Sequence, residues 1–231
     1  MPTGVPGLDA VLRGGLFAGA AYIVRGAPGA GKTILANQVC FHHARAGGQA
    51  LFVTLLAESH ARMIQHLERL DFYDPAPVPE RVYYVNAFRA LEEDGLPGLA
   101  ALLRREIRAR RTTFLVLDGM LMAEESGGSD REFRKFIHEL QAFVSAQGCA
   151  ALLLTSGGRA EHRPEHTMVD GLIALEDTRV GGRSQREVEV RKSRGSGALR
   201  GRHPFRITDG GLVVYPRIEA VLARPSRPQE G

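Results

Sequence analysis

The sequence predicts an α/β fold in which a mostly parallel central sheet is flanked by helices and carries an antiparallel extension toward the C-terminus. Short, fully apolar runs alternate with segments of helical periodicity, a pattern typical of parallel strands buried on both faces. The last third instead contains short strand patterns joined by glycine-rich turns. The 231 residues suit one large domain, expected at residues 1–220, followed by a disordered tail at residues 221–231.

The first two thirds of the chain should supply the parallel part of the sheet. Residues 3–19 are rich in turn residues, and an apolar strand follows at residues 20–24. A helix that begins with the apolar pattern of Ile34 and Leu35 should run to about Arg45, because Gly47 and Gly48 then end it. Further strands are expected at residues 50–55, 82–85, 113–117 and 149–155, with helices carrying Met63 to Leu70 and spanning residues 96–111 and 132–147. The extension should contain strands at residues 172–176, 187–192, 205–208 and 212–215.

A glycine-rich loop lies between the first strand and the first long helix. Its residues are Gly26, Ala27, Pro28, Gly29, Ala30, Gly31, Lys32 and Thr33, followed by Ile34, and they match the P-loop pattern G-x-x-x-x-G-K-[ST]. Glycines let backbone N–H groups turn toward phosphate oxygens, and the helix N-terminus adds the positive end of its dipole. Lys32 can reach the outer phosphates, and the Thr33 hydroxyl is placed to bind magnesium. Because a strand and a helix flank the motif, we expect it to bind a nucleoside triphosphate rather than to form an ordinary glycine-rich turn.

Two acidic residues follow core strands and are candidates for the same site. Asp118 ends the apolar run Phe114 to Leu117, so it can hold magnesium through water opposite Thr33. The alternative is an acid that caps the next segment. Glu58 follows the strand at residues 50–55 and can polarise an attacking water, since ligands bind beyond the carboxyl ends of such strands. The alternative for Glu58 is a helix N-cap, although Ser59 is the better cap.

Charge and composition narrow the functional class. The net charge is +4, and the basic residues form one cluster at residues 104–111 and another at residues 183–206. We interpret the first cluster as the solvated face of a helix. No apolar run is long enough to cross a membrane, and the N-terminus lacks the pattern of a secretory signal, so a cytoplasmic protein is expected. Cys40 and Cys149 lie in apolar surroundings and are expected to be buried thiols.

Several segments carry a family resemblance. They are Thr3 to Asp9, Gly14 to Leu16 with Gly19, the P-loop, Phe52 to Thr54, Glu58 with Ser59, Asp118, Val190 to Gly195, His203 to Phe205, and Ile207 to Gly210. Together they resemble the RecA-like ATPases, specifically the branch that contains KaiC and archaeal RadA. The resemblance covers nearly the whole chain and implies a single KaiC-like domain of RecA type that uses ATP and Mg²⁺.

The resemblance also implies an assembly. Members of this family form rings, often hexamers, with ATP between subunits, and a Lys-x-Arg segment of one subunit reaches the phosphates bound by its neighbour. Lys192 and Arg194 stand in that segment and are therefore candidates for a catalytic role in trans. The alternative for this second basic cluster is a solvated hairpin.

The sequence also departs from the family pattern. KaiC proteins usually show paired glutamates where this chain has Ala57 and Glu58, so hydrolysis is expected but slow. The phosphorylated Ser/Thr segment of KaiC has no match in this chain, so the resemblance does not imply autokinase activity.

Three functions follow in order of preference. The first is a ring-forming, Mg-dependent ATPase that acts in signalling or regulation, with room for an unidentified protein partner. The second is a DNA-binding recombinase paralogue whose loops at residues 120–130 and 157–167 line a channel; the acidic residues of the first loop argue against it. The third is a nucleotide-binding switch with little hydrolysis.

Overall fold

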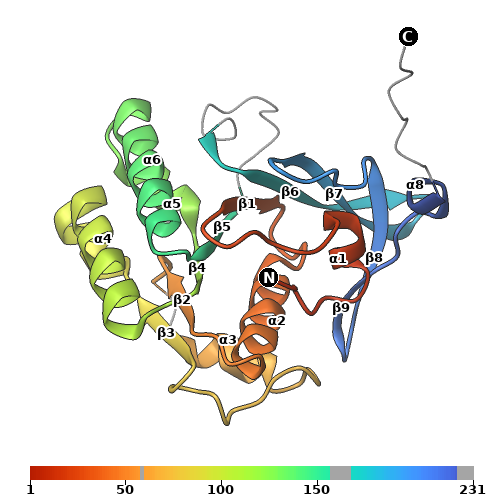
Figure 1. Ribbon diagram of the computed structural model, residues 1–231, viewed down its shortest axis with the longest axis horizontal. Helices are drawn as coiled ribbons and strands as arrows, with labels where there is room; N and C mark the ends of the chain where they lie inside the picture. Colours follow the sequence, from red (N-terminus) through yellow and green to blue (C-terminus); the bar gives the residue numbers. More distant parts are fainter. Residues whose placement is uncertain (58–59, 157–167, 223–231) are drawn as a thin grey trace.

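The computed structural model describes residues 1–57, 60–156 and 168–222. Within these ranges, nine strands form one sheet in the order β3-β2-β4-β5-β1-β6-β7-β8-β9 (Figure 1). The strands from β3 to β6 run parallel to one another, and those from β6 to β9 are antiparallel. The predicted α/β fold, with a mostly parallel sheet and a C-terminal antiparallel extension, is therefore confirmed.

The parallel strands occupy the positions that the apolar runs predict. They are β1 (Ala21–Gly26), β2 (Ala50–Thr54), β3 (Val82–Asn86), β4 (Phe114–Asp118) and β5 (Ala150–Thr155). β2 is buried along its whole length, as expected for a strand covered on both faces. β6 (Gly171–Val180) pairs with β1 on one side and begins the extension on the other.

The antiparallel extension is larger than the sequence patterns indicate. β6 and β7 (Arg183–Ser193) form a long hairpin, and β8 (Arg202–Thr208) and β9 (Gly211–Val214) form a shorter one. Short strands were predicted because exposed charged residues dilute the apolar pattern at the far end of the first hairpin, where residues 183–185 of β7 are exposed.

Two hydrophobic clusters, one on each face of the sheet, form the core. On β4, for example, Phe114 and Val116 belong to one cluster, whereas Leu115 and Leu117 belong to the other. This alternation follows from the two-residue period of a strand. The first face packs against α1 (Leu8–Leu12), α2 (Lys32–Arg45) and β9, and the second packs against α4 (Phe88–Arg110), α5 (Met120–Ser126) and α6 (Asp130–Ala146), as Figure 1 shows.

Several helices differ from the sequence predictions at their boundaries. α4 starts at Phe88 rather than at residue 96, and it contains a kink at Gly95, whose φ is 62°. The Gly95-Leu96-Pro97 sequence is typical of a helix break, which is why only the second half was predicted. α3 (His60–Leu67) ends earlier than expected, and α6 begins two residues earlier because the Ser129 hydroxyl accepts a hydrogen bond from the N–H of Glu132.

The prediction of a loop at residues 120–130 is wrong. Residues 120–130 were treated as a loop available to line a channel, but residues 120–126 form α5, whose Met120 and Ala123 are buried. The neighbouring glycines and acids suggested a loop, whereas packing against the sheet favours a helix. The second loop of that hypothesis, residues 157–167, and most of the expected tail lie outside the described residues. The last described element is the short helix α8 (Ile218–Leu222).

Candidate functional site

The carboxyl ends of the parallel strands bring the candidate residues together. The P-loop follows β1, Asp118 ends β4, and Thr54 ends β2 beside it. Since all of these strands run in the same direction, their ends share one edge of the sheet, which is where ligands bind in α/β proteins.

The P-loop has a backbone that suits phosphate. Gly29 and Gly31 have φ values of 80° and 102°, in the left-handed region that favours glycine. Gly31 is also the N-cap of α2, and no side chain caps that helix end. The N–H groups of the first turn of α2 therefore face the loop rather than a capping oxygen, the arrangement that binds anions at helix N-termini.

Lys32 lies at the mouth of this loop. Its ammonium donates hydrogen bonds to the carbonyl oxygens of Gly26 and Ala27, at 2.8 and 3.0 Å. Burial lowers the pKa of Lys32, and the charge of Asp118 opposes this shift. Lys32 is therefore a P-loop cation with an acidic neighbour, Asp118.

Thr33 and Asp118 meet across the base of the loop. The Thr33 hydroxyl donates to Oδ2 of Asp118 at 3.1 Å, although 85 residues separate the two in sequence. Burial raises the pKa of Asp118, while the Thr33 hydrogen bond, the Lys32 charge and the Gly119 N–H lower it. The pair offers a hydroxyl and a carboxylate oxygen, the ligand types that Mg²⁺ prefers, so the residues present fit that ion bound together with nucleotide phosphates. Among the described residues, no group of three or more His, Cys, Asp and Glu forms a separate metal site.

A pocket of about 320 Å³ opens beside this pair. α3 forms its far wall with His60, Arg62, Met63 and His66, none of which was predicted to belong to the site. The apolar spacing predicted a helix with Met63 and Leu67 on it, and the same spacing extended back to His60 could have placed that ring on the face toward the site. Glu58, the residue expected to polarise water, lies outside the described residues.

Lys192 and Arg194 do not join the P-loop of their own chain. Lys192 pairs with Leu172, which pairs with Ile23, three residues before the end of β1. The backbone of Lys192 is therefore about 10 Å from Gly26 along the strands and about 10 Å across them. Arg194 lies beyond it, where its N–H donates to the carbonyl of Asp170 at 2.8 Å and its side chain is 57% exposed.

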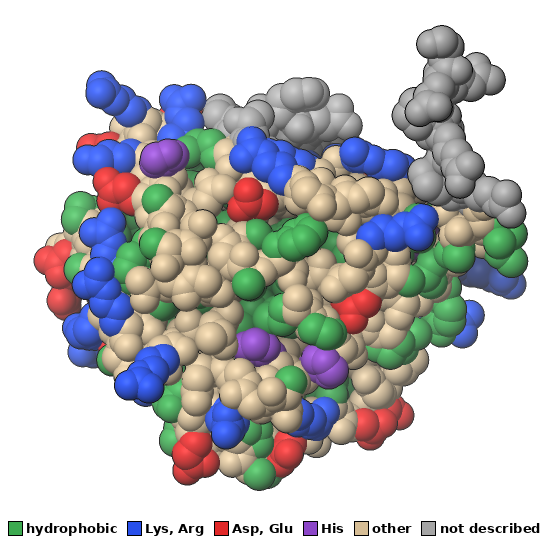
Figure 2. Space-filling view, viewed as in Figure 1, with side chains coloured by type: hydrophobic (Ala, Val, Ile, Leu, Met, Phe, Trp, Pro, Cys, Tyr) green, Lys and Arg blue, Asp and Glu red, His purple; other side chains and the backbone are tan. Residues whose placement is uncertain are grey.

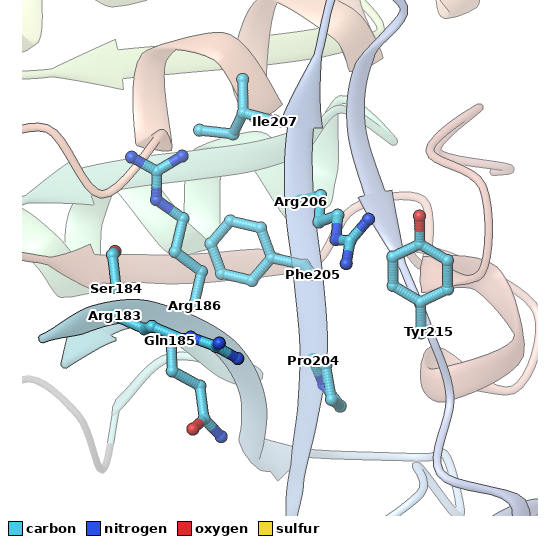
Figure 3. A pocket seen from close by; sticks show the side chains of 9 residues that line it. All are labelled: Arg183, Ser184, Gln185, Arg186, Pro204, Phe205, Arg206, Ile207 and Tyr215. Atoms are coloured by element: carbon cyan, nitrogen blue, oxygen red, sulfur yellow. The ribbon is translucent and has the colours of Figure 1, made fainter. Parts of the chain in front are cut away.

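A second and larger pocket, of about 750 Å³, lies in the antiparallel extension (Figure 3). Glu187 to Glu189 of β7 pair with β8. Toward the turn between β6 and β7, before Glu187, the two strands are not paired, and there is room between them. Arg186 and Phe205 point into this space in Figure 3, and Arg186 is held by an ion pair with Asp177 at 3.1 Å.

Ile207 connects the second pocket to the P-loop. It lines the pocket, and its Cδ1 lies where a side chain on Gly31 would collide with it, 2.7 Å from the position of a Cβ atom. The segment 203–210 contributed to the family resemblance, but nothing in its sequence revealed that it borders the P-loop. That contact depends on the long-range pairing of the extension.

The surface charge does not form one continuous basic area on the face shown in Figure 2. Lys and Arg side chains lie mostly around the rim of this face, and its centre is largely neutral. The arginines of α4 have local partners: Arg104 contacts Glu139 at 3.0 Å, and Arg110 contacts Glu106 at 3.0 Å. The interpretation of the first basic cluster as a solvated helix face agrees with these contacts. No helix in the described part of the chain is long and apolar enough to cross a membrane.

Residues 1–219 match the family model described as "ATPase: KaiC". A UPF0273 protein of Thermotoga maritima is 29% identical over 236 residues, which cover 93% of this chain and 95% of that protein. A UPF0273 protein of Methanopyrus kandleri is 30% identical and covers 93% of this chain and 91% of its own length.

Two further comparisons involve proteins that carry the KaiC name. The circadian clock oscillator protein KaiC of Rippkaea orientalis is 26% identical over 93% of this chain, but the match spans 43% of that protein. Among solved structures, a KaiC-like protein of Pyrococcus horikoshii superimposes with a TM-score of 0.80 over 94% of this chain, at 24% identity. This structural likeness supports the fold.

Proposed function

The chain belongs to the KaiC family of ATPases, and from that membership and the geometry of the P-loop we propose that it binds Mg·ATP and hydrolyses it slowly. The observation that carries the proposal is the meeting of Thr33 and Asp118, 3.1 Å apart, at the uncapped N-terminus of α2. A glycine-rich turn without a nucleotide has no need for a partly buried acid at this position.

In this proposal the P-loop holds the triphosphate. The N–H groups at the start of α2 donate to phosphate oxygens, and Lys32 exchanges its two carbonyl partners for the outer phosphates. Thr33 and Asp118 would hold magnesium, which would supply positive charge to neutralise the phosphates. Glu58 orients the attacking water and accepts its proton, as its place after β2 suggests.

The pocket beside Ile207 is the proposed site for the nucleoside. Ile207, which lines it, also approaches Gly31, and the pocket is bordered by Phe205 with Arg186 at its side. A base is flat and mostly apolar with a few polar edges, which this lining suits. The triphosphate and the base would then lie on the two sides of the contact between Gly31 and Ile207.

Catalysis in this proposal needs a second copy of the chain. Lys192 and Arg194 are too far from their own P-loop to act there, so their proposed role is to reach the phosphates bound by a neighbouring subunit in a ring, with a hexamer expected. A cation supplied across an interface is worth about 10³–10⁵ in rate in phosphoryl transfer. The proposed cellular task is signalling or regulation through nucleotide-dependent assembly, with a protein partner that is unidentified.

The test is the rate of ATP hydrolysis at increasing protein concentration, with the mass of the particle measured with and without Mg·ATP. We expect the specific rate to rise as rings form, to fall strongly in Arg194→Ala, and to fall in Glu58→Gln. Arg104→Ala is a matched control, because it removes an exposed arginine from α4, far from the sheet edge that carries the P-loop. A concentration-independent rate in a monomer would refute the ring, and an unchanged rate in Glu58→Gln would refute the role of Glu58.

A further inference from the structure

A buried amide on α2 binds the backbone of the antiparallel extension. Gln38 lies six residues after Lys32 on this helix and is buried. The N–H of Leu212 on β9 donates to Oε1 of Gln38 at 2.8 Å, and Nε2 of Gln38 donates to the carbonyl oxygen of Leu212 at 3.3 Å. One side chain thus satisfies both backbone polar groups of a residue 174 positions away in the chain.

The amide also packs directly against β9. Gly211, the residue before Leu212, has a φ of 95°, in the left-handed region that favours glycine. A Cβ atom at Gly211 would lie 2.7 Å from Oε1 of Gln38 and 2.8 Å from the ring of Phe72. The absence of a side chain at this position therefore lets the strand approach α2 closely enough for both hydrogen bonds to form.

The residue that Gln38 holds is paired with the residue that contacts the P-loop. Leu212 lies opposite Ile207 in the β8–β9 hairpin, and residues paired in this way project to the same face of a sheet. A Cβ atom at Gly31 would lie 2.7 Å from Cδ1 of Ile207 and 3.8 Å from Cδ1 of Leu212. Gly31 and Gln38 are seven residues apart, about two helical turns, and so lie on the same face of α2. The hairpin therefore contacts this face at two points, the amide and the P-loop glycine.

The same hairpin forms a wall of the pocket proposed for the nucleoside. Within β7, β8 and β9, all of which are described, residues 202–204 of β8 pair with β7, whereas residues 205–208 pair with β9 alone. Phe205 and Ile207 of this second part line the pocket, as Figure 3 shows. The place of this wall relative to the P-loop consequently depends on how the hairpin meets α2.

Other hydrogen bonds hold the ends of the hairpin. The N–H of Asp71 donates to the carbonyl oxygen of Asp209 in its turn, at 2.8 Å. At the opposite end, the N–H of Val214 donates to the carbonyl oxygen of Pro6, also at 2.8 Å. Gln38 acts between these ends, at the residue pair that contacts the P-loop.

We propose that Gln38 is a positioning residue for the nucleoside. By holding Leu212 it keeps Ile207 against Gly31, and it thereby fixes the separation between the phosphate site and the nucleoside pocket. This inference rests on the proposed function for the identity of the ligand, whereas the contact between Gln38 and β9 is a property of the protein without nucleotide. It predicts that loss of the amide weakens the binding of a nucleoside triphosphate more than that of a triphosphate without a nucleoside.

Two substitutions on α2 isolate this contact. Gln38→Met keeps the length of the side chain and removes both hydrogen bonds to β9. Asn37→Leu is the matched control, because Asn37 is the adjacent residue and also a buried amide. Its partners lie elsewhere: the carbonyl oxygen of Thr33 and the hydroxyl of Tyr84 on β3, each at 2.8 Å, and the sulfur of Met63 on α3 at 3.7 Å.

The first test is hydrogen–deuterium exchange in the nucleotide-free protein. Gln38→Met should accelerate exchange in residues 205–208 about tenfold, because two hydrogen bonds that oppose local opening of the hairpin are lost. Asn37→Leu should leave exchange in these residues within about twofold of the wild type. Equal exchange in the wild type and Gln38→Met would overturn the claim that the amide holds the hairpin.

The second test is calorimetric titration with Mg·ATP and with Mg·tripolyphosphate, which has the phosphates but no nucleoside. Gln38→Met should raise the Kd for Mg·ATP about tenfold and change the Kd for Mg·tripolyphosphate less than about twofold. Asn37→Leu should leave the ratio of the two Kd values unchanged. A merely structural role for Gln38 would alter both Kd values by the same factor, and that result would refute the proposal.

Ile207→Ala provides a second variant at a partly exposed position. It should reproduce the selective loss of Mg·ATP binding, and Gln38→Met added to it should cause no further change in the ratio of the two Kd values. Independent, additive effects would refute action through Ile207. If the wild type binds neither ligand, the proposed function fails together with the nucleoside role of Gln38. If it binds both and Gln38→Met does not change their ratio, the P-loop assignment stands and this inference alone fails.

Discussion

Replacing Thr33 by valine tests both the structure and the chemistry of the site. The substitution keeps the shape of the side chain and removes the hydroxyl that donates to Asp118 at 3.1 Å. A hydrogen bond to a charged group contributes about 1.5–3 kcal/mol, and the lower value applies because both side chains are only partly buried. For a domain of this size each kcal/mol shifts the melting temperature by about 2–4 °C. The nucleotide-free Thr33→Val protein should therefore melt about 3–6 °C below the wild type.

The same variant separates metal binding from stability. A ligand at about 100 times its Kd stabilises a protein by about 2.7 kcal/mol, or about 5–11 °C here. Wild type and Thr33→Ser, which keeps the hydroxyl, should show this increase with Mg·ATP and a smaller one with ATP in the presence of EDTA. Thr33→Val should show the same small increase with and without magnesium. The assay is a thermal melt of the three proteins under the three conditions. A full magnesium-dependent increase in Thr33→Val would refute the assignment of Thr33 as a magnesium ligand.

Three further predictions concern the fold. Gly171→Ala should lower the free energy of unfolding by about 1–3 kcal/mol in a denaturant titration, because the new Cβ would collide with the buried ring of Tyr22. Gly197→Ala is the control and should be neutral, because a Cβ there meets nothing within 4 Å. Both cysteines are buried, and burial raises the pKa of the Cys149 thiol to about 12. The native protein should therefore resist alkylation at pH 8 and react only in denaturant, so rapid labelling of the folded chain would contradict this burial. Burial also lowers the pKa of His60 below its ordinary value of 6.5. Above that pH the ring is neutral in both states; as the pH falls below it, the unfolded chain takes up the proton first and the free energy of unfolding decreases. His60→Gln should reduce the loss of stability between about pH 7 and 5.5, and an unchanged loss would show that the ring is not buried in its neutral form.

The sequence predicted best where one element carries its own signal. β2, β4 and β5 are continuous apolar runs, and strands buried on both faces require such runs. The C-terminus of α2 at Arg45 follows from the glycine pair after it. The first half of α4 and the whole of α5 were missed, because Gly95 with Pro97 and the acidic residues of α5 are locally typical of breaks and loops. Packing against the second face of the sheet overrides those local preferences.

The sequence by itself determined the family, the P-loop motif and the order of the core strands along the chain. These are local patterns, in which the spacing of a few residues dictates the backbone that they form. Only the tertiary structure decided that Thr33 meets Asp118, that Ile207 borders the P-loop and that Asn37 joins α2 to β3 and α3. It also placed Lys192 away from the P-loop of its own chain. Each of these facts depends on strand order and register. Both arise from contacts between residues far apart in the chain, so the local sequence does not predict them.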